Sequence, residues 1–232
     1  IINFIKMLKF YKIVLFAIII STSNVNAHVE HYDKLNRIEF DIYRNNKNIG
    51  KHIFTFQRDG SKLSVKSLIN FEIKKLGVVL YRYKAEGTEV FEDGILIKFN
   101  SKTNQNKKEK YVNLKFVNNE YVIDGSSYKG NTSKDHVLGT WWNHGIVKAK
   151  AQISAVSGRI IHQNVIFLGK EKVRIGEKTY NALHFNFKST DKKLAKDKKL
   201  NTHVWYDEET LNWIKASFDK SGKWEYRLVS IE

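Results

Sequence analysis

The fold class follows from one stretch, Leu63-Ser64-Val65-Lys66-Ser67-Leu68-Ile69-Asn70-Phe71-Glu72-Ile73-Lys74. Apolar and polar side chains mostly alternate along it, so that Val65 and Phe71 fall on one side while Lys66 and Glu72 fall on the other. Successive side chains of a strand point to opposite faces of a sheet. The stretch therefore predicts a strand with one buried face and one solvated face.

The same alternation recurs on both sides of this stretch, for example in residues 38–42, 112–116 and 183–187. Turn residues separate the alternating segments, including Asn45–Asn48 and the dipeptide Asp93-Gly94, which is a strong hairpin signal. Strands that follow one another through short turns form an antiparallel meander. The sequence predicts an α+β domain, mainly β: a curved antiparallel sheet, or open half-barrel, of about ten or more strands.

Residues 130–155 lack the alternation. Ser133 is a residue type that caps helices, and it precedes Lys134-Asp135-His136. We therefore expect a short helical insert at Ser133–Ala155, with Trp141–Gly145 in a helix or a loop. No internal repeat and no linker is evident, so residues 37–232 are predicted to form a single β-rich domain.

The N-terminal residues have the three parts of a secretory signal peptide. Lys9 and Lys12 give a positive region, residues 13–20 an apolar core, and Val25-Asn26-Ala27 a cleavage site with small residues. We expect a signal peptide over residues 1–27, a true start at Met7, a flexible leader over residues 28–36, and a periplasmic or secreted protein. An uncleaved anchor is the alternative, but the apolar run is shorter than the about 20 residues that a spanning helix needs.

The lack of cysteine and the distribution of charge exclude some functions and make others less expected. The 232 residues contain no cysteine, which excludes disulfides, thiolate metal sites and cysteine nucleophiles. The formal net charge is +16, but the lysines are scattered through polar strand faces and turns. Nucleic acid is therefore not an expected partner, whereas an anionic membrane surface is a possible one.

No phosphate-binding loop, His-Glu-x-x-His motif or nucleophile elbow occurs in the sequence. If the fold brought His144, His203 and Asp207 together, they could bind a metal or perform acid–base chemistry. This hypothesis defines one alternative, an exported hydrolase or metal-dependent enzyme. Scattered histidines are more often surface residues, so we assign no catalytic residue, no metal ligand and no cofactor.

The strongest candidate for a ligand site is the aromatic segment around Trp141. Core packing is the main alternative role for these tryptophans, because aromatic side chains bury large areas. Two adjacent tryptophans in an irregular segment cannot easily both point inward, however, so one of them is expected to line an opening. This interpretation predicts that Trp142→Ala lowers ligand retention more than thermal stability. The candidate ligand-binding residues are Trp141, Trp142, Asn143, His144 and Trp205.

Five short stretches resemble an uncharacterised exported bacterial family, the domain of unknown function numbered 6134. They are Thr140-Trp141-Trp142-Asn143, Ser157-Gly158-Arg159, Val204-Trp205-Tyr206-Asp207, Ser221-Gly222 and Tyr226-Arg227-Leu228. The family is similar in shape to periplasmic lipoprotein-carrier proteins, whose curved sheet holds an acyl chain. The resemblance implies such a shape and supplies no catalytic residues.

These observations favour a periplasmic binding or carrier module for an apolar, lipid-like ligand. The predicted sheet is rich in Phe, Ile and Tyr on its inner face, which must be filled by side chains or by ligand. Besides the enzyme, a purely structural envelope protein remains as a second alternative. An enzymatic function is not the favoured reading.

Overall fold

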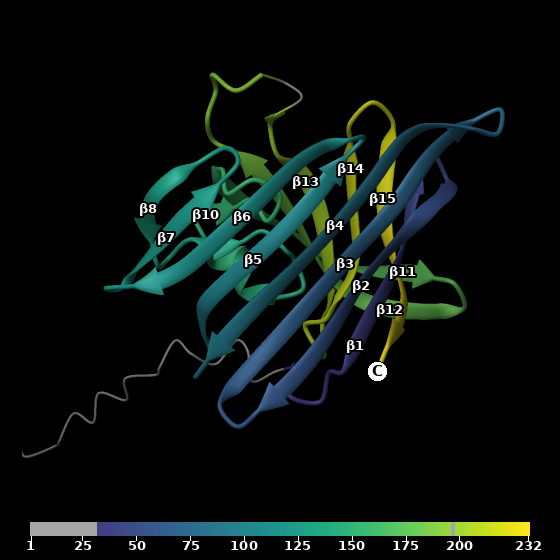
Figure 1. The fold of residues 1–232 in the computed structure, drawn as a ribbon. Coiled ribbons are helices and arrows are strands. Elements are labelled where there is room, and N and C mark those ends of the chain that lie inside the picture. The colour runs from purple at the N-terminus through teal and green to yellow at the C-terminus, as the bar shows by residue number, and fades with distance from the viewer. Residues whose placement is uncertain (1–31, 196–197) are drawn as a thin grey trace, which may run out of the picture.

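A computed structural model describes residues 32–195 and 198–232 of the chain. The predicted signal peptide and the first residues of the predicted leader lie outside this part. The described residues form one 15-stranded sheet, in the order β8-β7-β6-β5-β4-β3-β2-β1-β15-β14-β13-β12-β11-β10-β9 (Figure 1). Neighbouring strands in the sheet are neighbours in sequence, except where the first strand pairs with the last.

The strands in the first half of the described chain are β1 (Arg37–Arg44), β2 (Lys47–Asp59), β3 (Lys62–Lys75), β4 (Val78–Glu92), β5 (Ile95–Gln105), β6 (Lys108–Val117), β7 (Glu120–Gly125) and β8 (Lys129–Ser133). The elements in the second half are β9 (Val137–Leu138), the 3-10 helix η3 (His144–Lys148), β10 (Ala151–Ile153), β11 (Ile160–Ile175), β12 (Lys178–Ser189), β13 (Asn201–Asp207), β14 (Trp213–Asp219) and β15 (Lys223–Ile231).

The observed strands follow the alternation of the sequence. In β3, Leu63, Val65 and Phe71 are buried, while Lys66 and Asn70 are exposed. All strand pairs are antiparallel apart from β9 and β10, which pair in parallel. The predicted fold class, a curved antiparallel sheet that stays open, is therefore confirmed.

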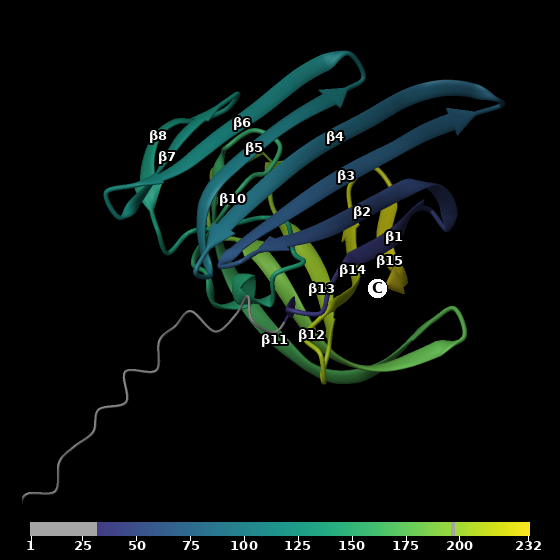
Figure 2. The same ribbon diagram turned by 60° about the horizontal axis from the view of Figure 1, so that its bottom comes forward.

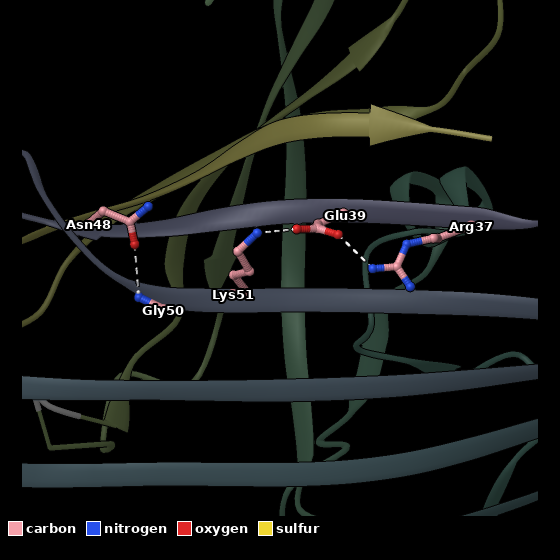
Figure 3. A network of polar contacts seen from close by, with 5 residues as sticks. All are labelled: Arg37, Glu39, Asn48, Gly50 and Lys51. Atoms are coloured by element: carbon pink, nitrogen blue, oxygen red, sulfur yellow. Dashed lines mark hydrogen bonds and ion pairs between the residues drawn. The ribbon is translucent and has the colours of Figure 1, made fainter.

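The outer face of the sheet is polar where β1 and β2 pair (Figure 3). Glu39 accepts hydrogen bonds from Lys51 and, at 2.6 Å, from Arg37. The Lys51 ammonium and the Arg37 guanidinium together lower the pKa of the Glu39 carboxyl. Asn48 Oδ1 accepts a hydrogen bond from the Gly50 amide at 3.0 Å. This face matches the solvated face that the alternation predicts.

The inner face is covered by residues 134–159, which we call the inner segment. Figure 2 shows β3–β6 on one side of it and β11–β13 on the other. Ser101 Oγ on β5 donates to the Ala155 carbonyl at 2.6 Å, and Gln163 Nε2 on β11 donates to the Ala149 carbonyl at 3.1 Å. The two ends of the sheet thus curl around one irregular stretch of chain.

The predicted helix beginning at Ser133 is wrong. Ser133 ends β8, and its hydroxyl accepts a hydrogen bond from the Asp135 amide at 3.1 Å, which forms a tight turn instead of a helix cap. The following residues pair as β9 with β10, and this pairing takes up backbone groups that a helix would need. The helical content of the inner segment is the five-residue η3 alone.

Part of the predicted leader belongs to the core. Tyr32 and Leu35 are buried, with exposed fractions of 2% and 6%. The Tyr32 hydroxyl accepts a hydrogen bond from the His144 amide at 2.9 Å, so the residues before β1 support η3. Within the described residues, no helix is both long and apolar enough to cross a membrane.

Candidate ligand-binding cleft

One end of the concave face is packed around Trp142, which has no exposed surface. Its indole ring meets the rings of Tyr32, Phe56 and Phe91 edge-on, at centroid distances of 5.3, 5.3 and 5.7 Å. The indole Nε1 donates a hydrogen bond to Glu89 Oε1 at 2.9 Å. We call this region the packed end. Trp142 is therefore a core residue.

Glu89 lies on the inner side of β4 and is only 2% exposed. Burial disfavours the charged carboxylate and raises the pKa of Glu89 to about 7, although hydrogen bonds from Trp142 and Thr140 partly oppose the shift. The carboxyl group thus titrates near neutral pH inside the protein. It joins the sheet to the inner segment through the Trp142 indole.

Trp141 points away from the packed end. Its backbone is in the left-handed region, with φ of 62°, and its carbonyl accepts a hydrogen bond from the Tyr206 hydroxyl at 2.9 Å. The half-buried indole ring meets Trp213 and Tyr226 edge-on at 5.6 and 6.0 Å. With this backbone conformation at Trp141, the two adjacent indole rings lie in different places, one in the cleft and one in the packed end.

Trp141 lines a cleft of about 1820 Å³ between the sheet and the inner segment. The floor of this cleft is mostly apolar or aromatic, and it is contributed by β2, β3, β4, β14 and β15. The floor residues are His52, Ile69, Tyr83, Phe218 and Tyr226. A concave site with apolar walls and a few polar groups is the usual form of a small-molecule site.

Two polar atoms at this floor have unmet hydrogen-bonding capacity. Among the described residues, neither His52 Nδ1 nor Trp141 Nε1 has a hydrogen-bond partner, although both atoms are buried. His52 Nε2 bonds to Ser67 Oγ at 2.9 Å, and burial lowers the pKa of the imidazole to about 3, so the ring is neutral. Buried polar atoms normally find partners, and a polar group on a bound ligand would supply one.

The wall and mouth of the cleft are strongly basic. Seven cationic side chains line it: Lys110, Arg159, Lys188, Lys192, Lys198, Lys199 and Lys220. The acidic side chains that line it are Asp191 and Asp219. The cleft therefore combines an aromatic floor with an excess of positive charge, which suits an amphiphile with an anionic head.

Asn143 and His144 hold the inner segment in place. Asn143 caps η3, because its side-chain oxygen accepts a hydrogen bond from the Gly145 amide at 2.8 Å. The His144 ring is buried against Tyr206 and Phe185, at centroid distances of 4.8 and 5.9 Å. Neither side chain is among those that line the cleft.

Trp205 lies on the opposite face of the sheet from the cleft. Its neighbour on β13, Tyr206, points inward to Trp141, so Trp205 points outward. It stacks on His184 at 4.1 Å, Lys215 lies 4.8 Å above its ring, and its indole donates to Glu171. Of the five candidate ligand-binding residues, Trp141 alone lines the cleft, and Trp205 lies on the other face of the sheet.

The structure does not bring His144, His203 and Asp207 together. His203 and Asp207 share the outer face of β13, separated by four residues or about 13 Å of extended strand. His144 packs against Tyr206 on the inner face. Over residues 32–195 and 198–232, no group of three or more His, Asp or Glu side chains is arranged to hold a metal ion.

Two residues of this region, His52 and Glu89, were not among the sequence candidates. Glu89 had a usable signal, since the alternation that places Tyr83 and Ala85 on the inner face also places Gly87 and Glu89 there. A carboxylate at an inward position is rare unless it has a partner. The cationic residues of the cleft had no such signal, because five segments distant in sequence contribute them.

The described strands form one open antiparallel sheet that curves around the inner segment and the cleft. A crystal structure of a β-barrel-like protein of Domain of Unknown Function DUF1849 from Brucella abortus is similar, with a TM-score of 0.58 and 10% identity. That similarity covers 85% of this chain and 98% of the other. At this identity, the similarity shows the fold alone.

Residues 40–229 match the family described as Domain of unknown function (DUF6134), and the chain belongs to that family. The resemblance inferred from its aromatic motifs is thus confirmed. A DUF1329 family protein from Desulfovibrio piger has 8% identity over 89% of each chain, but its TM-score of 0.20 is too low to support an inference. No curated protein is similar enough to count as a match.

Proposed function

We propose that this protein binds and carries a lipid-like amphiphile with an anionic head group. The observation that carries the proposal is the cleft of about 1820 Å³, which is lined by Tyr226 on the floor, by Trp141 of the inner segment and by seven cationic side chains. Pockets for drug-sized ligands have volumes of about 300–1,000 Å³. The cleft is large enough for an extended acyl chain together with its head group.

The two ends of such a ligand would meet different parts of the cleft. The acyl chain would cover Ile69, Phe218 and the exposed side of Trp141, which gains free energy in proportion to the apolar area removed from water. The head group would lie among the lysines near residues 188–199. A polar atom near the ligand's middle would reach His52 Nδ1 or Trp141 Nε1.

We propose a periplasmic or extracellular location for this function. The predicted signal peptide at residues 1–27 supports it, and the sizeable apolar core is compatible with an exported chain that has no disulfides. A carrier in that location would shield an acyl chain from water between two membranes or between a membrane and the medium.

Lipid analysis of the purified protein tests the proposal. The protein would be purified from the envelope fraction without detergent, denatured, and extracted for mass spectrometry. We expect an acyl-containing anion in near-stoichiometric amount. Trp141→Ala should lower this amount, while Trp205→Ala, the matched change on the outer face, should leave it unchanged per folded molecule.

Two results would contradict the proposal. If no acyl species copurifies with the protein, and none binds when it is added, the structural envelope role gains support instead. If the lipid load falls equally in the Trp141 and Trp205 variants, the load reflects general stability or nonspecific adsorption, and the cleft is not its site.

A further inference from the structure

The β3–β4 hairpin extends beyond both of its neighbours in the sheet. The partners of β2 on β3 stop at Phe71, and the partners of β5 on β4 stop at Tyr83. Apart from one hydrogen bond from the Asn106 amide to the Arg82 carbonyl at 2.8 Å, residues 72–82 therefore pair only with one another, as a two-stranded ribbon with two open edges. Figure 1 shows this ribbon projecting past the rest of the sheet. We call it the β3–β4 ribbon.

The tip of the β3–β4 ribbon carries exposed apolar side chains. Leu76 is 96% exposed, Val78 62% and Leu80 55%. Isolated two-stranded hairpins are only marginally stable in water, and open edges with apolar side chains promote aggregation. A contiguous exposed apolar patch usually marks a contact with another molecule.

The turn at the tip has a leucine in the left-handed backbone conformation, which leucine rarely adopts. Leu76 has φ of 49° and is followed by Gly77 at 80°. Asn and Asp tolerate this left-handed conformation better than leucine does. At the corresponding positions of four other turns the chain has Asn45, Asp93, Asn106 and Asn118. Neither burial nor the turn conformation explains a leucine at this position, which points to an intermolecular role.

The charges beside the tip favour a partner with a negatively charged surface. The β3–β4 ribbon contains three cations, Lys74, Lys75 and Arg82, and one carboxylate, Glu72. Glu72 is shared by Lys74 at 3.0 Å and Arg82 at 2.7 Å, so the base of the tip keeps a net positive charge. Apolar side chains flanked by cations are the arrangement that binds at the surface of an anionic bilayer.

We infer that the β3–β4 ribbon docks the protein on a bilayer containing anionic lipids, with Leu76, Val78 and Leu80 inserted among the head groups. The inference extends the proposed carrier function by naming its membrane contact. Docking and lipid copurification are separate measurements, so either can fail while the other succeeds.

A second projecting ribbon provides an internal control. The partners of β13 on β12 begin at Ala182, so residues 172–181 also extend beyond the neighbouring strand. The turn of this β11–β12 ribbon is Gly176-Glu177, and charged residues surround it. It has a similar shape and exposure but a polar tip, so the inference predicts that it stays in water.

Site-specific fluorescence tests the inference, because a chain without cysteine accepts one engineered thiol at a chosen position. The variants Leu76→Cys and Glu177→Cys would each be labelled with a nitrobenzoxadiazole dye. Vesicles of phosphatidylglycerol and phosphatidylcholine would then be added. We expect a blue-shifted, several-fold brighter emission at position 76 and no change at position 177.

A second measurement separates apolar insertion from simple charge attraction. In vesicle cosedimentation, Leu76→Asn with Leu80→Ser should reduce binding at least tenfold while keeping every cation and the favoured turn geometry. Val229→Thr removes an exposed apolar side chain, 52% exposed, from β15 and should bind as the unmodified protein does.

Three outcomes would overturn the inference. If the emission of a dye at position 76 does not change with any vesicle, the ribbon does not bind membranes, and a protein becomes the expected partner. Equal responses at positions 76 and 177 would show attraction without a preferred orientation. Unchanged vesicle binding by the Leu76 and Leu80 double variant would show that the net charge alone, and not the apolar tip, recognises the membrane.

Discussion

Trp141 and Trp142 are neighbours in the chain, but they lie in two contrasting regions of the concave face. Trp142 fills the packed end, where aromatic rings and the buried Glu89 carboxyl surround it. Trp141 borders the cleft, and its indole nitrogen has no hydrogen-bond partner within the described part of the chain. The sheet is thus neither packed solid nor empty, and one segment of irregular backbone both plugs one end and lines the other.

The largest expected effect is the loss of stability on emptying the packed end. Trp142→Ala should lower the free energy of unfolding by about 3–5 kcal/mol, because the surrounding rings can only partly collapse and the Glu89 carboxyl loses its donor. Urea denaturation at pH 7 measures this change. A loss below about 1 kcal/mol would mean that Trp142 is not the centre of a packed region.

A related effect concerns the Glu89 carboxyl and pH. Its pKa is 4.5 in a solvated reference state and about 7 in the fold, so the folded state binds more protons between these values. The contribution of Glu89 to stability is therefore favourable below pH 4.5 and is lost as pH rises through 7. Glu89→Gln, a neutral mimic, should gain roughly 3 kcal/mol over the unmodified protein above pH 7.

The measurement for this effect is the difference in unfolding free energy between the two proteins as a function of pH. It should be close to zero below pH 4.5 and should grow towards pH 7 and above. Burial lowers the pKa of His52, so this residue makes the stability of both proteins rise with pH. Subtracting the two unfolding free energies removes this shared contribution and leaves that of Glu89. A difference that does not vary with pH would place Glu89 in contact with water.

A change in the cleft should lower the unfolding free energy less than a change in the packed end, and it should weaken ligand binding. Trp141→Ala should weaken binding of a long-chain fatty acid about tenfold, which is about 1.4 kcal/mol, while the unfolding free energy falls by only about 1 kcal/mol. Calorimetric titration and urea denaturation of the same variant provide the two values. This expectation reverses the one drawn from the sequence, in which Trp142 was the ligand-retaining residue.

The smallest effect concerns the charged mouth of the cleft. Replacing Lys198 and Lys199 by Glu should weaken fatty-acid binding about fivefold at low salt, since each cation near an anionic head contributes about 1 kcal/mol or less. The difference should shrink at high salt because exposed charges are screened. The same replacement at Lys172 and Lys178, on the β11–β12 ribbon, is the control and should change binding little.

The sheet could be predicted because its physical cause is local. Alternation in stretches such as residues 63–74, together with Asn and Asp at the turns, specifies strands, faces and an up-and-down order. The inner segment was located correctly by its lack of alternation. Its helix was overpredicted, because the β9–β10 pairing joins residues that alternation cannot relate.

The candidate site was harder to predict because it depends on side-chain direction. The opposite orientations of Trp141 and Trp142 follow from a backbone φ of 62°, which no pattern of residues reveals. Strand parity groups Trp205 with His203 and Asp207 on one face of β13, but both faces carry aromatic residues, so the concave face could not be identified. The cationic lining comes from strands and loops that are distant in sequence, so the complete fold was needed to find it.

The most direct measurement is photo-crosslinking of the protein with a long-chain fatty acid that carries a diazirine in its acyl chain. After irradiation and digestion, mass spectrometry identifies the labelled peptides. We predict labelling of the peptides that contain Trp141, Ile69 and Tyr226, and competition by unlabelled fatty acid. Labelling confined to peptides of the outer face, or labelling that unlabelled fatty acid does not reduce, would contradict a ligand-binding cleft.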